Sequence, residues 1–189
     1  MKTSCCQIIG LILLVNTNLA LIISFATPYW VEFKPMQLNA NNYKHLPSDR
    51  QNRGLLADCS SNDCHWSFFG DDRNGTDYPA WFKATQGLMS VALALGLIAL
   101  LVATLSLCCT CHSCNPHHPI CGFLIIASVS IAVAIVVFGI KAKNEWGIDF
   151  QMELMSSGRF GWSFWTAVGA AASALLTSTI YCCMDRKRH

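Results

Sequence analysis

Cysteine and histidine are the residues of this chain best suited to chemistry, and they gather in one short segment. The chain has 11 cysteines and 6 histidines among its 189 residues. Segment 108–121, CCTCHSCNPHHPIC, holds five of the cysteines and three of the histidines. Four Cys or His ligands suffice for tetrahedral zinc, and a Cys-x-x-Cys dithiol can be redox-active. Zinc binding and thiol redox catalysis are therefore the first functions to weigh.

Neither chemistry finds support in the surrounding sequence. Cys111 and Cys114 form a Cys-x-x-Cys pair, and no βαβ pattern surrounds them. No nucleophile motif, P-loop or Rossmann fingerprint occurs elsewhere in the chain. We therefore expect no metal, no cofactor and no enzymatic activity, with a CxxC membrane oxidoreductase as a further alternative. The simpler interpretation is a set of membrane-apposed cysteines. Its candidates for palmitoylation are Cys108, Cys109, Cys182 and Cys183.

Four apolar runs determine the class of protein. They cover roughly residues 8–27, 87–107, 120–140 and 162–181, and none contains Asp, Glu, Lys, Arg or His. Each is about 20 residues long, the length that an α-helix needs to cross the ~30 Å hydrocarbon core of a bilayer. Only 13% of the residues are charged, against about 25% in soluble domains. We predict an all-α transmembrane four-helix bundle, with residues 1–189 forming one tetraspan domain.

Charge excludes several functions. The formal net charge of +2 gives no reason to expect nucleic-acid binding. Proton pumps and ion-coupled transporters usually carry an ionisable residue within the membrane, and these runs have none. The first run could instead be a cleaved secretory signal. It is long for that role, however, and Asn16, Thr17 and Asn18 interrupt it.

The segments between the runs predict the sidedness of the chain. Cys59 and Cys64 are the only cysteines in the long segment 28–86, as expected in an oxidising compartment. The same segment contains the glycosylation sequon at Asn74. Lys2 and the basic residues 186–188 place positive charge at both ends, as expected for cytosolic termini. We predict a plasma-membrane protein with cytosolic termini, extracellular loops 28–86 and 141–161, a cytosolic loop 108–119 and a cytosolic tail 182–189.

The paired cysteines predict a small sheet. Ser, Asn and Asp separate Cys59 from Cys64, and these residues favour turns. A hairpin here would set the two cysteines opposite each other, close enough for a disulfide; two unpaired thiols are the alternative. Residues 29–33 and 66–69 also look strand-like. We expect a small extracellular antiparallel β-sheet formed mainly by the first extracellular loop.

The motifs of this loop resemble a known family. Trp30, then Gly54-Leu55-Leu56, then Cys59 and Cys64 resemble the W…GLW…C…C signature of the claudin superfamily, which includes peripheral myelin protein and the epithelial membrane proteins. Leu56 replaces the second tryptophan of that signature. Residues 84–89 and 161–164 resemble the starts of the family's second and fourth helices. The resemblance implies a left-handed four-helix bundle beneath an extracellular sheet. It also implies scaffold roles for Trp30, Gly54, Leu55, Cys59 and Cys64.

The resemblance also implies a function. Claudins oligomerise side by side and across apposed cells, so we expect a structural adhesion or paracellular-barrier role at cell–cell junctions. Its expected partners are membrane lipid and, in a homo-oligomer or a hetero-oligomer, further copies of the chain or related tetraspans, in cis or in trans. The alternative is an accessory or regulatory subunit, or a membrane organiser, of the epithelial-membrane-protein or channel γ-subunit type. It would bind another membrane protein laterally.

Two groups of loop residues are candidates for the working surface. Acidic residues could give a junctional pore a mild cation preference, or could simply be solvated; they are Asp58, Asp63, Asp71, Asp72 and Asp77. Apolar residues of the loop 141–161 could contact an opposing cell or pack on their own sheet; they are Phe150, Met152, Leu154 and Met155.

Small and polar residues in the runs suggest how the helices pack. Gly169, Ser173 and Thr177 recur every four residues, as do Ser128 and Ala132. Asn16 and Asn18 are expected to hydrogen-bond to neighbouring helices. The tryptophans are expected at the outer membrane interface, although Trp30 and Trp66 could instead pack beneath the sheet.

Overall fold

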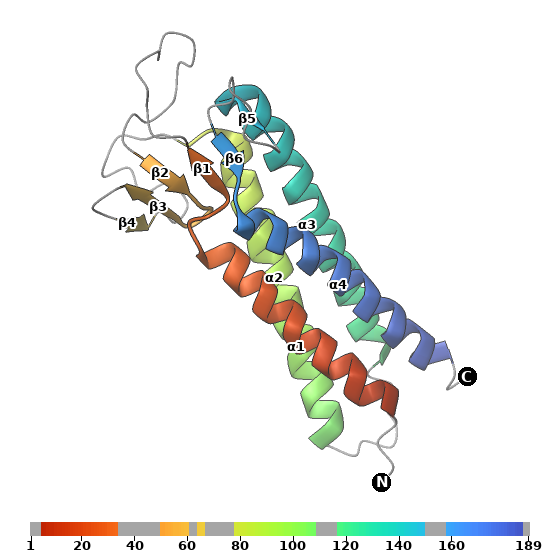
Figure 1. The fold of residues 1–189 in the computed structure, drawn as a ribbon. Coiled ribbons are helices and arrows are strands. Elements are labelled where there is room, and N and C mark those ends of the chain that lie inside the picture. The colour runs from red at the N-terminus through yellow and green to blue at the C-terminus, as the bar shows by residue number, and fades with distance from the viewer. Residues whose placement is uncertain are drawn as a thin grey trace.

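A computed structural model describes residues 5–33, 50–60, 64–66, 78–108, 117–149 and 158–186. Its four helices are α1 (Cys5–Ala26), α2 (Ala80–Cys108), α3 (His117–Trp146) and α4 (Trp162–Arg186). Its strands are β1 (Val31–Phe33), β2 (Arg50–Arg53), β3 (Ala57–Ser60), β4 (Cys64–Trp66), β5 (Ile148–Asp149) and β6 (Gly158–Phe160). The strands lie at one end of the helical bundle, opposite the start of α1 and the end of α4 (Figure 1).

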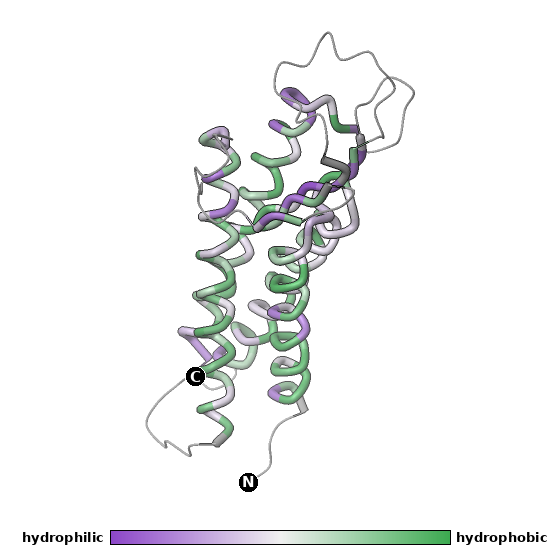
Figure 2. Tube along the Cα trace, turned by 90° about the vertical axis from the view of Figure 1, so that its left-hand side faces the viewer, coloured by the Kyte–Doolittle hydropathy of each residue, from purple (hydrophilic) through white to green (hydrophobic). Residues whose placement is uncertain are grey.

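The four helices span the membrane, as predicted. Each is long and apolar enough to cross a bilayer, and each overlaps one predicted run. Only 28–39% of each span is buried within the bundle. The remaining helical surface is largely apolar and therefore suits lipid. Figure 2 shows hydrophobic colour along the helices and hydrophilic colour concentrated near the sheet. Helices α2 and α3 extend beyond their apolar runs at the sheet end, by about two turns.

Polar contacts connect the helices inside the bundle. Helix α1 packs against α2 and α4, and α3 packs against the same two helices. The hydroxyls of Thr17 and Ser173 lie 2.9 Å apart between α1 and α4. Asn18 Nδ2 donates to the Gly96 carbonyl of α2 at 3.2 Å, and Ser128 Oγ donates to the Ala171 carbonyl of α4 at 3.0 Å. These bonds join helix pairs across the core.

The packing predictions were correct for some residues and wrong for others. Asn18 bonds to a neighbouring helix, but Asn16 is exposed on the outer face of α1. Two residues apart on a helix means about 200° of rotation, so both side chains cannot face the core. Of the small residues, Ser128 and Thr177 are buried, whereas Ala132 and Gly169 face outward.

The strands form one six-stranded sheet with the order β4-β3-β2-β1-β6-β5. Strands β1 to β4 come from the segment between α1 and α2, and β5 and β6 come from the segment between α3 and α4. All neighbours are antiparallel except β5 and β6, which are parallel. The expected antiparallel sheet is thus a mixed sheet. The expectation rested on the hairpin of the first loop and did not include the parallel pairing of β5 with β6, in the segment between α3 and α4.

Candidate functional site

Trp30 fixes the sheet to the top of the bundle. Its side chain is fully buried, and its ring lies edge-on to Phe138 of α3 and Phe164 of α4, with centroids 4.9 and 5.7 Å away. Its indole Nε1 donates to the Ser24 carbonyl at 2.7 Å, so the burial leaves this polar group paired. Trp30 packs beneath the sheet, as considered above. Trp66 does not, because it is 69% exposed on the edge strand β4.

The turn between β2 and β3 docks on two helices. Gly54 lies directly against the Thr27 carbonyl and Pro28 at the end of α1, where any Cβ would collide with backbone. Leu55 is buried, and its carbonyl accepts a hydrogen bond of 2.5 Å from Gln86 Nε2 of α2. Position 54 therefore requires glycine, because a side chain there would collide with the backbone of Thr27 and Pro28. Position 55 supplies an apolar anchor.

A buried ion pair lies just below this turn. Arg53 Nε and Asp58 Oδ1 are 3.4 Å apart, and their side chains are only 7% and 2% exposed. The Tyr78 hydroxyl donates to Asp58 Oδ2 at 2.9 Å. Buried charges are tolerated when they are paired and hydrogen-bonded. This pair therefore holds β2, β3 and the residues that lead into α2 in one arrangement.

Aromatic rings enclose the guanidinium of Arg53. Its Cζ lies 4.8 Å from the Tyr78 ring centroid, 5.2 Å from that of Phe82 and 4.7 Å from that of Trp146. Cations are attracted to aromatic faces within about 6 Å, the more strongly when desolvated. Phe82 belongs to α2 and Trp146 to α3, so these ring contacts connect the Arg53–Asp58 pair to both helices.

The cage was not predicted from the sequence. Asp58 was expected to be a loop charge that could face a pore, whereas the structure buries it against Arg53. The two residues are directly opposite in the β2–β3 register. Arg53 and Asp58 directly flank the four residues 54–57, which was the available signal, but using it required recognising β2.

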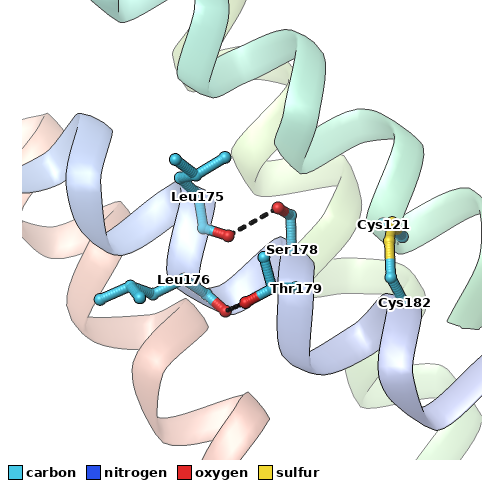
Figure 3. Close-up of a disulfide and its surroundings, with 6 residues drawn as sticks. All are labelled: Cys121, Leu175, Leu176, Ser178, Thr179 and Cys182. Atoms are coloured by element: carbon cyan, nitrogen blue, oxygen red, sulfur yellow. Dashed lines mark hydrogen bonds between the residues drawn. A yellow bond between two sulfur atoms is a disulfide. The ribbon is translucent and has the colours of Figure 1, made fainter.

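Cysteines are paired at both ends of the structure. Cys59 and Cys64 form a disulfide and lie opposite each other in the β3–β4 register, which closes the edge hairpin. A second disulfide joins Cys121 of α3 to Cys182 of α4 near the opposite end (Figure 3). This pairing was not predicted from the sequence, in which Cys182 was a candidate for palmitoylation. Cys6 and Cys183 are exposed free cysteines among the described residues.

The other candidate residues lie outside the described segments or near their ends. Within the described segments, no group of three or more His, Cys, Asp or Glu residues is arranged to hold a metal ion. Cys108 is the last residue of α2, whereas Cys109 and the Cys111–Cys114 pair fall outside the described residues. The remaining candidates also fall outside them; they are Asp63, Asp71, Asp72, Asn74, Asp77, Phe150, Met152, Leu154 and Met155.

Comparison with protein families agrees with this architecture. The model of the PMP-22/EMP/MP20/Claudin family matches residues 4–181, from the first described helix to near the end of the fourth. The chain belongs to this family. Comparison with individual curated proteins gives no significant match. Membership in the PMP-22/EMP/MP20/Claudin family makes the chain a claudin-like tetraspan, with the sheet positioned on the bundle by the contacts described above.

Proposed function

We propose that this protein is a structural component of cell–cell contacts and that it presents its six-stranded sheet outside the cell for adhesion or a paracellular barrier. The observation that carries the proposal is the junction around Trp30 and Arg53. The sheet is joined to the helices by a buried indole, a buried ion pair and the Gln86–Leu55 hydrogen bond. A surface held in one orientation loses little conformational entropy when it binds a partner. Such a surface suits repeated contacts between neighbouring molecules.

The proposed surface includes an exposed aromatic residue at the β4 edge of the sheet, beyond which no further strand pairs among the residues that the structure describes. Strand β4 is the last strand on its side of the sheet, and Trp66 and His65 are both exposed on it. Edge strands offer unpaired backbone groups to another chain, and exposed tryptophans are frequent anchors of interfaces. We therefore place the contact with a related tetraspan, in cis or in trans, at the β4 edge.

Cell–cell localisation tests the function. In cells that lack junctional strands, the tagged protein is expected to concentrate at contacts between two expressing cells and to form strands in freeze-fracture images. Trp66→Ala is expected to reduce this enrichment at least twofold, because the variant removes the exposed anchor while leaving the core unchanged. His65→Ala, on the same strand, is the matched control and should retain it. A uniform plasma-membrane distribution with dispersed particles would reject the adhesion role.

An accessory subunit or membrane organiser is the second candidate. Leu56 stands where the resembling signature has its second tryptophan, and it packs half-buried against the core. The chain departs here from the signature of the whole superfamily, so strand formation does not carry over by resemblance, and a member that binds another membrane protein laterally and forms no strands is the second candidate. Dispersed freeze-fracture particles that co-purify with one other membrane protein would support this candidate.

The proposal places the sheet outside the cell and the end of α4 on the cytosolic side, and two covalent modifications test this sidedness together. With the sheet outside, Asn74 is expected to carry an N-glycan, so glycosidase treatment should shift the wild-type protein and leave Asn74→Gln unshifted. Cys183, an exposed thiol near the end of α4, is expected on the cytosolic side as a palmitoylation site together with Cys108 or Cys109. Acyl-exchange labelling should detect a thioester that Cys183→Ser reduces. A glycan-free Asn74 with sheet residues protected from protease on intact cells would contradict this sidedness.

A further inference from the structure

The outer face of α1 contains a polar side chain at an apolar depth. Asn16 is the twelfth residue of the 22-residue helix α1, and it is exposed. Its carboxamide makes no hydrogen bond to any other described residue. The hydroxyls of Thr104 and Thr179, on other spans, instead bond to carbonyls of their own helices. Because the bilayer centre holds no water, an amide there is stabilised only by a polar partner.

The residues around Asn16 repeat with the spacing of a helix–helix interface. Ile9, Ile12, Asn16, Leu19 and Ile23 are all exposed, and their spacing alternates between three and four residues. This is an a/d heptad pattern, with Ile9, Asn16 and Ile23 at a and Ile12 and Leu19 at d. β-Branched residues at a with leucine at d, as in the Leu19–Ile23 part of this face, favour two-stranded parallel packing, and one Asn at an a position specifies register and oligomeric state.

The inner face of α1 is already occupied by this chain. Leu14, Asn18, Leu21 and Phe25 are buried and form the side of α1 that faces the bundle. Asn18 bonds to Gly96 of α2, and Thr17 bonds to Ser173 of α4. An additional helix can therefore pack on the outer face without displacing α2 or α4.

We propose that this outer face forms a parallel dimer with a second copy of the chain, in which the two Asn16 carboxamides hydrogen-bond to each other. A carboxamide has both donors and an acceptor, so it is complementary to its own copy across a two-fold axis. Two copies in one membrane have the same orientation. In-register packing of α1 on α1 therefore brings Asn16 to Asn16. Lipid chains offer no such partner.

Fluorescence transfer between full-length chains in phosphatidylcholine vesicles tests the dimer. Donor and acceptor labels are attached to C-terminal tags, and the protein-to-lipid ratio is varied. Asn16→Leu is expected to raise the ratio at half-maximal transfer about fivefold, the effect of one interhelical hydrogen bond. Asn16→Gln, which keeps the carboxamide, should stay within about twofold of wild type. Asn144→Leu changes an exposed asparagine at the sheet end of α3 and is the matched control.

Cross-linking tests the position of the interface. Leu19 and Val129 are both exposed apolar residues on membrane spans, at 51% and 58%. Under a membrane-permeant oxidant, Leu19→Cys is expected to give at least three times more covalent dimer than the unmodified chain, and Val129→Cys no increase. Adding Asn16→Leu should reduce the Leu19→Cys dimer.

Three results would overturn the dimer. They are an Asn16→Leu midpoint equal to wild type, equal cross-linking at positions 19 and 129, and capture of a different membrane protein by Leu19→Cys in cells. The readouts in vesicles do not depend on cell contacts. Loss of the adhesion role would therefore leave this inference intact, and failure of the dimer would not reject the adhesion role.

Discussion

Replacing Trp30 with alanine is expected to lower the free energy of unfolding by about 3–5 kcal/mol, the range for removing a large aromatic side chain from a core. Trp30 is fully buried at the point where β1 leaves α1. Its ring contacts Phe138 and Phe164 of two different helices, and its Nε1 donates to Ser24. The alanine variant loses the apolar contacts, leaves a cavity and removes this hydrogen bond. Thermal unfolding in detergent micelles, followed by far-UV circular dichroism, measures the change.

Trp66→Ala is the matched control for this effect. The same substitution on β4 removes a side chain that is 69% exposed, so the expected change is within about 0.5 kcal/mol. Equal effects at positions 30 and 66 would show that Trp30 does not anchor the sheet. The comparison also separates the two roles assigned to tryptophan here, since Trp66→Ala is expected to weaken cell–cell contacts without lowering stability.

The helices could be predicted from the sequence because each is determined by a local property. An uncharged run of about 20 residues has few stable alternatives to a membrane-spanning helix. The Cys59–Cys64 hairpin could also be predicted from local sequence, since only a short run of turn-forming residues separates the two cysteines. The ends of the helices were less predictable. Residues 80–86 of α2 and 141–146 of α3 are more polar, and they are helical where α2 and α3 reach the sheet.

The sheet as a whole and the cage around Arg53 depend on residues that are distant in sequence. Strand β6 pairs with β1, although more than 120 residues separate Glu32 from Arg159. The rings around Arg53 come from Tyr78, Phe82 and Trp146, on segments that meet only after the bundle forms. A pattern within one loop contains no information about such partners. The Cys121–Cys182 pairing escaped prediction for the same reason, because it joins α3 to α4.

The junction explains how the signature residues work together. Gly54 permits a close backbone approach to Thr27 and Pro28, directly after α1. The Leu55 carbonyl accepts a hydrogen bond from Gln86 of α2, and the Arg53 guanidinium lies against rings of α2 and α3. The hairpin β2–β3 thus contacts α2, α3 and the residues that directly follow α1. The disulfide fixes only the outer hairpin, β3–β4. The orientation of the sheet on the bundle therefore depends on buried contacts more than on the covalent bond.

After the contacts of Trp30, the Arg53–Asp58 ion pair is the interaction whose loss is expected to lower the free energy of unfolding most. Asp58→Ala is expected to lower the free energy of unfolding by about 3–5 kcal/mol, because it leaves the buried guanidinium of Arg53 without its counter-charge. Tyr78 also loses its acceptor. Glu32→Ala is the matched control. It breaks the Arg159–Glu32 pair on the same sheet, in which the side chains are 50% and 23% exposed, and about 1 kcal/mol or less is expected.

A double variant distinguishes the loss of the pair from the presence of an uncompensated charge. Replacing both partners, as Arg53→Met with Asp58→Leu, is expected to recover at least half of the loss seen in Asp58→Ala, since apolar residues of similar volume often substitute for a buried ion pair. Thermal unfolding in micelles measures all four proteins under one condition. An Asp58→Ala cost no greater than that of Glu32→Ala would contradict the assigned role. A double variant less stable than Asp58→Ala would instead show that the rings of Phe82 and Trp146 require the cation itself, so that cation–π attraction exceeds the ion pair in holding the sheet to the bundle.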